Sequence, residues 1–126
     1  MSYFSKDAAA GGALRIVRGD ELKGVAAAPG LTLHPLIGEG MNLNVVVIEP
    51  NGVAELHAHD EEQMGYVVTG ECEFTDGSST WILEPGDTYH AAANVPHGAR
   101  SLGDRCVIID CFAPVRAGIR ELLEQS

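Results

Sequence analysis

The sequence predicts an all-β protein, a sandwich or barrel of short strands with one short helix near the C-terminus. From residue 31 to residue 112, short apolar or alternating segments follow one another and turn residues separate them. Fifteen glycines and six prolines are spread along the chain, as turn residues are. Many short strands at nearly regular spacing are typical of an all-β sandwich or barrel.

The predicted strands are short, and most of them end at a glycine, a proline or an acidic turn. The sequence Pro50-Asn51-Gly52 ends a valine-rich segment, and Asp76-Gly77 is a β-hairpin signal. Strands are expected over residues 31–37, 44–48, 53–59, 63–69, 71–75, 80–83, 88–92, 97–101 and 106–112. A single helix is expected after them, over residues 114–124. Pro114 suits its first turn, and Ile119, Leu122 and Leu123 share one face.

The length of 126 residues suits one domain with one hydrophobic core. Residues 1–12 are small, polar and rich in alanine, so we expect a loose arm or an edge segment that becomes ordered against a partner. We therefore assign residues 1–28 to an N-terminal arm and edge segment, and residues 29–126 to the barrel with its helix. The arm and the uncovered edges of an open two-sheet barrel predict a homodimer.

The chain is acidic, with eighteen Asp and Glu residues against eight Lys and Arg, and its formal net charge is −10. This charge repels phosphate backbones and anionic membranes, so neither nucleic acid nor a membrane is an expected partner. Cys72, Cys106 and Cys111 fit no disulfide framework or zinc knuckle, so buried thiols are expected. The sequence has no signal peptide and no apolar stretch of roughly 18 residues, so a cytoplasmic location is expected.

A group of histidines provides the clearest functional signal. His57 and His59 stand two residues apart in a predicted strand, so both side chains point to the same face. Gln63 follows after a tight acidic turn, at the start of the next strand, where an antiparallel pair can place it opposite the two histidines. His97 comes from a distant strand and follows Pro96. Imidazoles that meet on one face can bind a divalent metal ion.

Three neighbouring or unassigned residues are alternatives to these expected metal ligands. Glu62 could be the ligand in place of Gln63, but the strand would have to slip by one residue and turn every neighbour to the wrong face. His34 and His90 stand in strands without a motif, so each is expected to be structural or to line a pocket. His90 precedes the strand of His97 and is kept as a minor candidate for the cavity.

Two signatures, in the correct order, resemble those of the cupin superfamily. The first comprises Gly52, His57, His59, Gln63 and Gly70, and the second runs from Pro85-Gly86-Asp87 to Val95-Pro96-His97. The resemblance covers residues 40–112 and implies a cupin double-stranded β-helix, a jelly-roll barrel with the metal inside. It implies one divalent metal ion held by His57, His59, Gln63 and His97. Zinc, nickel, manganese and iron all suit these ligands.

The C-terminal part of the chain adds a second resemblance. Asp110 and Phe112 share a strand face, and Arg116 follows them. With Gln63 and the opening Met1-Ser2-Tyr3-Phe4, this pattern resembles the pectin-degradation (KdgF-like) subfamily of small cupins, which open unsaturated uronate rings. The resemblance implies that Asp110, Phe112 and Arg116 are catalytic. A structural ion pair between Asp110 and Arg116 remains an alternative.

These observations predict a metal-dependent enzyme of the isomerase or lyase type, acting on a small acidic molecule. Ring opening of a sugar acid is the specific hypothesis, in which Asp110 moves a proton with His90 as a candidate helper and Arg116 holds an acidic group. Gln63 stands where many cupins have a glutamate, and a neutral ligand set favours non-redox chemistry. A metal-dependent dioxygenase and a non-catalytic binding cupin are the two alternatives.

Overall fold

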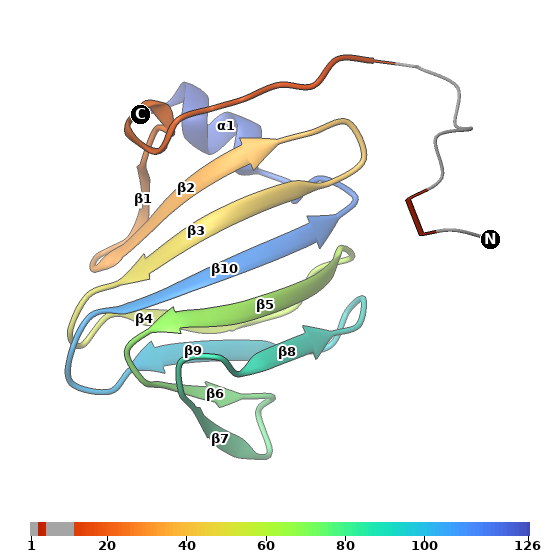
Figure 1. Cartoon of the computed structure of the whole chain (residues 1–126). Helices are drawn as coiled ribbons and strands as arrows, with labels where there is room; N and C mark the ends of the chain where they lie inside the picture. Colours follow the sequence, from red (N-terminus) through yellow and green to blue (C-terminus); the bar gives the residue numbers. More distant parts are fainter. Residues whose placement is uncertain (1–2, 5–11) are drawn as a thin grey trace.

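The computed structural model describes residues 3–4 and 12–126, and its strands form two antiparallel sheets that face each other (Figure 1). The six-stranded sheet has the order β1-β2-β3-β10-β5-β8, with strands Val25–Ala28, Leu31–Ile37, Asn42–Ile48, Cys106–Ala113, Glu62–Thr69 and Thr88–Ala91. The four-stranded sheet has the order β4-β9-β6-β7, with strands Val53–His57, His97–Ser101, Cys72–Thr75 and Thr80–Leu83. The predicted all-β jelly-roll fold is confirmed. In the described part of the chain the two sheets are separate hydrogen-bonded units, so the barrel is a jelly-roll-like sandwich.

Alternation of buried and exposed residues explains how the strands cover the interior. Strand β3 alternates buried and half-buried positions along its whole length, and β10 does so up to its last residue. At one end the inward positions are apolar, as at Val46, Ile48 and Ile108. At the other end the inward positions are polar, as at Asn44 and Asp110, which face each other in the register of β3 and β10. The interior therefore has an apolar end and a polar end, and the polar end holds the site.

The structure corrects several of the predicted elements. The strand expected over residues 53–59 ends at His57, so His59 lies in the loop that follows. Strand β1, Val25–Ala28, pairs with β2 at the sheet edge and was not predicted, because one valine and three alanines show no alternation. The helix α1 spans Ile119–Glu124 and does not begin at Pro114 as predicted. Gly118 precedes the helix with a φ of 88°. Pro114 lies in a bend, and Ala117 and Gly118 form a turn. A short 3-10 helix, Gly19–Glu21, precedes β1.

Some expectations concern the ends of the chain and the cysteines. Most of the predicted arm, residues 1–12, lies outside the described residues. Cys72 and Cys106 are buried and Cys111 is half-buried, and all three are free thiols. Among the residues described, no helix is long and apolar enough to cross a membrane.

Candidate metal centre

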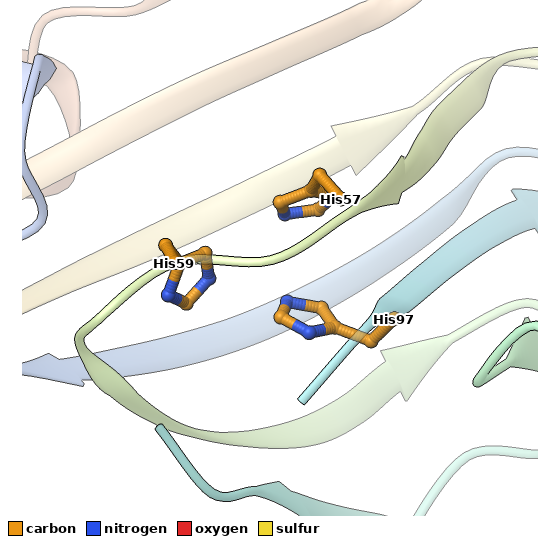
Figure 2. Close-up of side chains that lie close together, drawn as sticks. All are labelled: His57, His59 and His97. Carbon is orange, nitrogen blue, oxygen red and sulfur yellow. The ribbon is translucent and has the colours of Figure 1, made fainter. Parts of the chain in front are cut away.

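Three histidines lie together at the polar end of the sandwich. His57 ends β4, His59 lies in the loop that follows, and His97 begins β9 beside His57 in the register of these two strands. Figure 2 shows the three imidazole rings gathered from these segments. One ligand atom from each histidine can be chosen so that all three lie within 4.8 Å of one another. The structure therefore brings His57, His59 and His97 close enough together to hold a metal ion.

Backbone carbonyls fix the orientation of all three rings. The Nδ1 atoms of His57, His59 and His97 lie 2.6, 3.0 and 2.8 Å from the carbonyl oxygens of Glu55, Glu61 and Val95. A carbonyl oxygen only accepts hydrogen bonds, so each Nδ1 carries a proton, and in the neutral form of each ring the Nε2 lone pair is free to bind a metal. Burial also lowers the pKa of His97, which favours its neutral form. Three neutral imidazoles with free Nε2 atoms are the form that binds a metal.

Gln63 meets the histidines from the opposite sheet. Strand β5 pairs with β10 and β8, so Gln63 does not face the histidines within one antiparallel pair as predicted, but reaches them across the interior. Its Oε1 atom lies 2.9 Å from both His59 Nε2 and His97 Nε2. Glu62, the alternative ligand, points outward and pairs with His90 at 2.7 Å. Gln63 therefore faces the interior and Glu62 faces outward, which agrees with the preference for Gln63, although the strand that carries Gln63 pairs with other strands than expected.

The Oε1 atom of Gln63 meets the Nε2 atoms of His59 and His97, and all three are hydrogen-bond acceptors when the rings are neutral. The Gln63 Nε2 atom donates to the Tyr89 hydroxyl at 2.7 Å, and that hydroxyl donates to Asp110 Oδ1. Because the single hydroxyl proton goes to the carboxylate, the amide must present its NH₂ group to Tyr89 and its oxygen to the histidines. Lone pairs of two imidazoles and one amide oxygen then converge. A cation among them would turn this repulsion into attraction, so the residues present fit a divalent metal.

Tyr89 and Asp110 form a buried pair beside this centre. Burial raises the pKa of Asp110 to about 7, although hydrogen bonds from Tyr89 and Gln63 oppose the shift. Burial, together with the charge of Asp110, raises the pKa of Tyr89 far above its usual value, so its hydroxyl stays protonated. Gly65 makes room for the pair, because a Cβ atom there would overlap the Tyr89 ring and stand 2.5 Å from Asp110 Oδ1. The structure thus places a carboxylate that can change its protonation next to the histidines.

Arg116 pairs with Glu61, whereas the sequence left a pair with Asp110 open. The Arg116 Nη1 atom lies 3.8 Å from Glu61 Oε1, while Glu61 Oε2 accepts a hydrogen bond of 2.9 Å from the backbone N–H of Ala117. Burial acts to raise the pKa of Glu61, but the Ala117 N–H and the Arg116 charge hold it below its usual value. The same carboxylate lies 3.3 Å from His59 Nδ1. Glu61 therefore connects the segment that carries Arg116 to a histidine of the centre.

A cavity of about 330 Å³ opens at this centre. His57, His97, Gln63, Asp110 and Arg116 line its polar part. Phe112 also lines the cavity, and its ring lies 5.6 Å from that of His59. All three residues predicted to be catalytic thus line the same cavity as His57 and His97.

Sequence reasoning missed two residues of this site. Tyr89 was passed over for its neighbour His90, whose half-exposed side chain pairs with Glu62 on the outer surface. The alternation of a strand could have identified Tyr89, because every second residue of β8 faces inward and His90 therefore faces outward. Glu61 was taken only as part of an acidic turn, and no spacing signal marks it as buried.

The second predicted histidine outside the motifs also has a defined place. His34 is half-buried on β2, and its Nδ1 atom lies 3.2 Å from the carbonyl oxygen of Leu22. A Cβ atom on Gly24 would lie 2.6 Å from its ring. His34 therefore packs at the sheet edge, which agrees with a structural role.

The fold and the histidine group define a class of protein, the cupins. The chain belongs to the cupin family, since the family model for the cupin domain matches residues 44–112. Solved cupin structures share this fold. One is an RmlC-like cupin from Shewanella frigidimarina NCIMB 400, with a TM-score of 0.76, 24% identity and coverage of 83% of this chain and 95% of that one.

Within the family, the similarity is to KdgF proteins. The KdgF structure from Halomonas sp. matches with a TM-score of 0.73 and 29% identity over 79% of this chain and 94% of that one. The pectin degradation protein KdgF of Dickeya dadantii (strain 3937) is 42% identical over 62 residues, 48% of this chain and 56% of that protein. The predicted resemblance to KdgF-like cupins is confirmed.

A second curated relative carries an enzyme name. H2HPP isomerase of Bacillus subtilis is 39% identical over 72 residues, which are 56% of this chain and 30% of that protein. The chain thus spans little more than half of the KdgF protein and less than a third of the isomerase. These names agree with the predicted class, an enzyme of the isomerase or lyase type.

Proposed function

We propose that the protein is a metal-dependent cupin enzyme that moves a proton in a small acidic substrate, in an isomerisation, ring opening or lyase-type reaction without redox chemistry. The observation that carries the proposal is the convergence of His Nε2 lone pairs and the Gln63 oxygen beside the buried Tyr89–Asp110 pair. The relatives named KdgF and H2HPP isomerase support it.

The metal would be held by the Nε2 atoms of His57, His59 and His97 and by the Oε1 atom of Gln63. When bound, a divalent ion supplies Lewis acidity to a carbonyl or carboxylate oxygen of the substrate. All four ligands are neutral, so the site keeps the full charge of the ion. That charge favours stabilising an enolate and disfavours a higher oxidation state, which is why we place non-redox chemistry ahead of dioxygenase chemistry.

Asp110 is the residue that would take the proton. Its carboxylate lines the cavity, and burial raises its pKa to about 7, so it can accept and release a proton near neutral pH. Tyr89 donates to one oxygen of this carboxylate and fixes its orientation. His90 is no longer needed in this step, because its side chain lies on the outer surface with Glu62.

Arg116 and Phe112 would position the substrate. The Arg116 side chain is partly exposed at the cavity, and its only hydrogen bond to a described residue is the 2.9 Å bond from Nη1 to the Ala117 carbonyl oxygen. Its other N–H groups can bind a substrate carboxylate in two-point fashion. Phe112 provides an apolar wall next to His59. A sugar acid and a keto acid with a hydrocarbon body both carry the carboxylate that this arrangement requires.

Metal analysis and anaerobic turnover test the proposal. Purified protein should bind close to one divalent ion per chain, and a screen of unsaturated uronates and 2-keto acids should reveal turnover that consumes no oxygen. Zinc or nickel should support this turnover as well as iron does. Strict dependence on iron and oxygen would contradict the proposal and favour a dioxygenase. Ligand binding without any turnover would favour a binding cupin.

A further inference from the structure

The cavity extends from the metal centre toward the apolar end of the sandwich. Its deep lining is formed by side chains from both sheets, namely Leu31, Val46, Ile48, Phe74 and Ile108. These residues belong to the main core cluster and are at most 9% exposed. A molecule bound at the histidines therefore extends into a space with hydrocarbon walls.

The polar groups of the cavity are gathered near the histidines, and most are already engaged. The Gln63 NH₂ group donates to Tyr89, and the Tyr89 hydroxyl donates to Asp110. Asn44 accepts a hydrogen bond of 3.4 Å from Asn42. A ligand with several hydroxyl groups would find few partners beyond this end, and a buried hydroxyl without a partner costs free energy.

We propose that the substrate is a small 2-keto acid whose remainder is hydrocarbon, in place of the polyhydroxylated sugar acid that the sequence resemblance implies. The inference rests on the proposed function and specifies its substrate class. The carboxylate and keto oxygen occupy the polar end near Arg116 and the histidines. The hydrocarbon body lies between Val46, Phe74 and Ile108, where it removes apolar surface from water. A volume of about 330 Å³ lies within the range of small-molecule sites.

Titration calorimetry with the zinc-loaded protein tests this substrate class through three probes. The probes are pyruvate, 4-methyl-2-oxopentanoate, which adds a branched hydrocarbon to the same keto acid, and galacturonate. The branched keto acid should bind at least about tenfold more tightly than pyruvate, because each buried carbon adds affinity in an apolar pocket. Galacturonate should bind no more tightly than pyruvate.

A matched pair of variants on β3 locates the hydrocarbon body. Val46 lines the cavity, whereas Val47 is its neighbour on the other face of the strand. V46T should weaken binding of the branched keto acid by about fivefold or more and leave pyruvate binding unchanged. V47T makes the same chemical change and should leave both affinities unchanged. Zinc content and circular dichroism verify that each variant is folded, and the comparison of probes on the unaltered protein needs no variant.

The outcomes separate this inference from the function on which it rests. If none of the probes binds to the zinc-loaded protein, the proposed function and the inference both fail. Two results would overturn only the proposed substrate class and leave the proposed function standing. In one, pyruvate binds but the branched keto acid binds no more tightly. In the other, galacturonate binds most tightly. Equal effects of V46T and V47T on the branched keto acid would also overturn its placement along the inner face of β3.

Discussion

At the scale of single residues, the orientation of the three histidine rings depends on the backbone carbonyl oxygens next to their Nδ1 atoms, as well as on the spacing of the histidines in the sequence. We predict that the double variant H57A/H59A loses its divalent metal while the barrel still folds, because the apolar core does not require the centre. Metal analysis and circular dichroism of the same samples measure the two effects. His34→Ala removes a histidine outside the centre and serves as the control. Full metal retention in the double variant would contradict the assignment.

Asp110 gives the second prediction at this scale. Asp110→Asn keeps the size of the side chain but removes the basic carboxylate, so kcat should fall by roughly 10²–10⁴ while metal content stays unchanged. Steady-state kinetics and metal analysis on one preparation check this combination. Glu62→Gln alters an exposed carboxylate on the outer surface and should leave kcat unchanged. Undiminished activity of Asp110→Asn would leave Asp110 with a purely structural role.

At the scale of elements, strand β5 has to pass close to its neighbours at Gly65. We predict that Gly65→Ala destabilises the protein by about 1–3 kcal/mol, because the added carbon overlaps the Tyr89 ring and crowds Asp110. Gly40→Ala adds the same carbon where no atom lies within 4 Å and should have little effect. Chemical denaturation of the metal-free proteins measures the difference in the free energy of unfolding. Equal stability of the two variants would contradict the close packing at Gly65.

The elements also show what a sequence can predict and what it cannot. Alternation identified the inward faces, so His57, His59, Gln63, Asp110 and Phe112 were expected to point to the interior. Alternation does not determine which strands pair, so Gln63 was expected beside the histidines in one sheet and was found in the other.

Residues without a motif were harder to predict. Glu61 is buried because its carboxylate meets Ala117 and Arg116, which are distant in sequence. Tyr89 is defined by its contacts with Gln63 and Asp110. Such contacts join segments that are distant in sequence, as β5, β8 and β10 are within the six-stranded sheet, and no local pattern indicates them.

At the scale of the whole molecule, the outer face of the six-stranded sheet is apolar. Met64, Tyr66 and Val68 alternate outward along β5 and are 56%, 48% and 38% exposed. We propose that this face joins two copies of the chain, and we predict a dimer in light scattering at about tens of micromolar. Tyr66→Lys should shift the protein toward the monomer, whereas Ile82→Lys on β7 should not. A monomer at this concentration would contradict the prediction.

The carboxylate of Glu61 couples the histidine centre to the C-terminal segment that carries Arg116. It accepts the N–H of Ala117 and lies beside His59, so an ion that fixes His59 also fixes the anchor of the C-terminal segment. Thermodynamic linkage makes this effect reciprocal. We predict that amide hydrogen exchange at Ala117 slows when zinc is added, and that Glu61→Gln reduces this protection without removing the ion. The segment that carries Arg116 would then be held more firmly beside the cavity in the metal-loaded protein than in the metal-free protein.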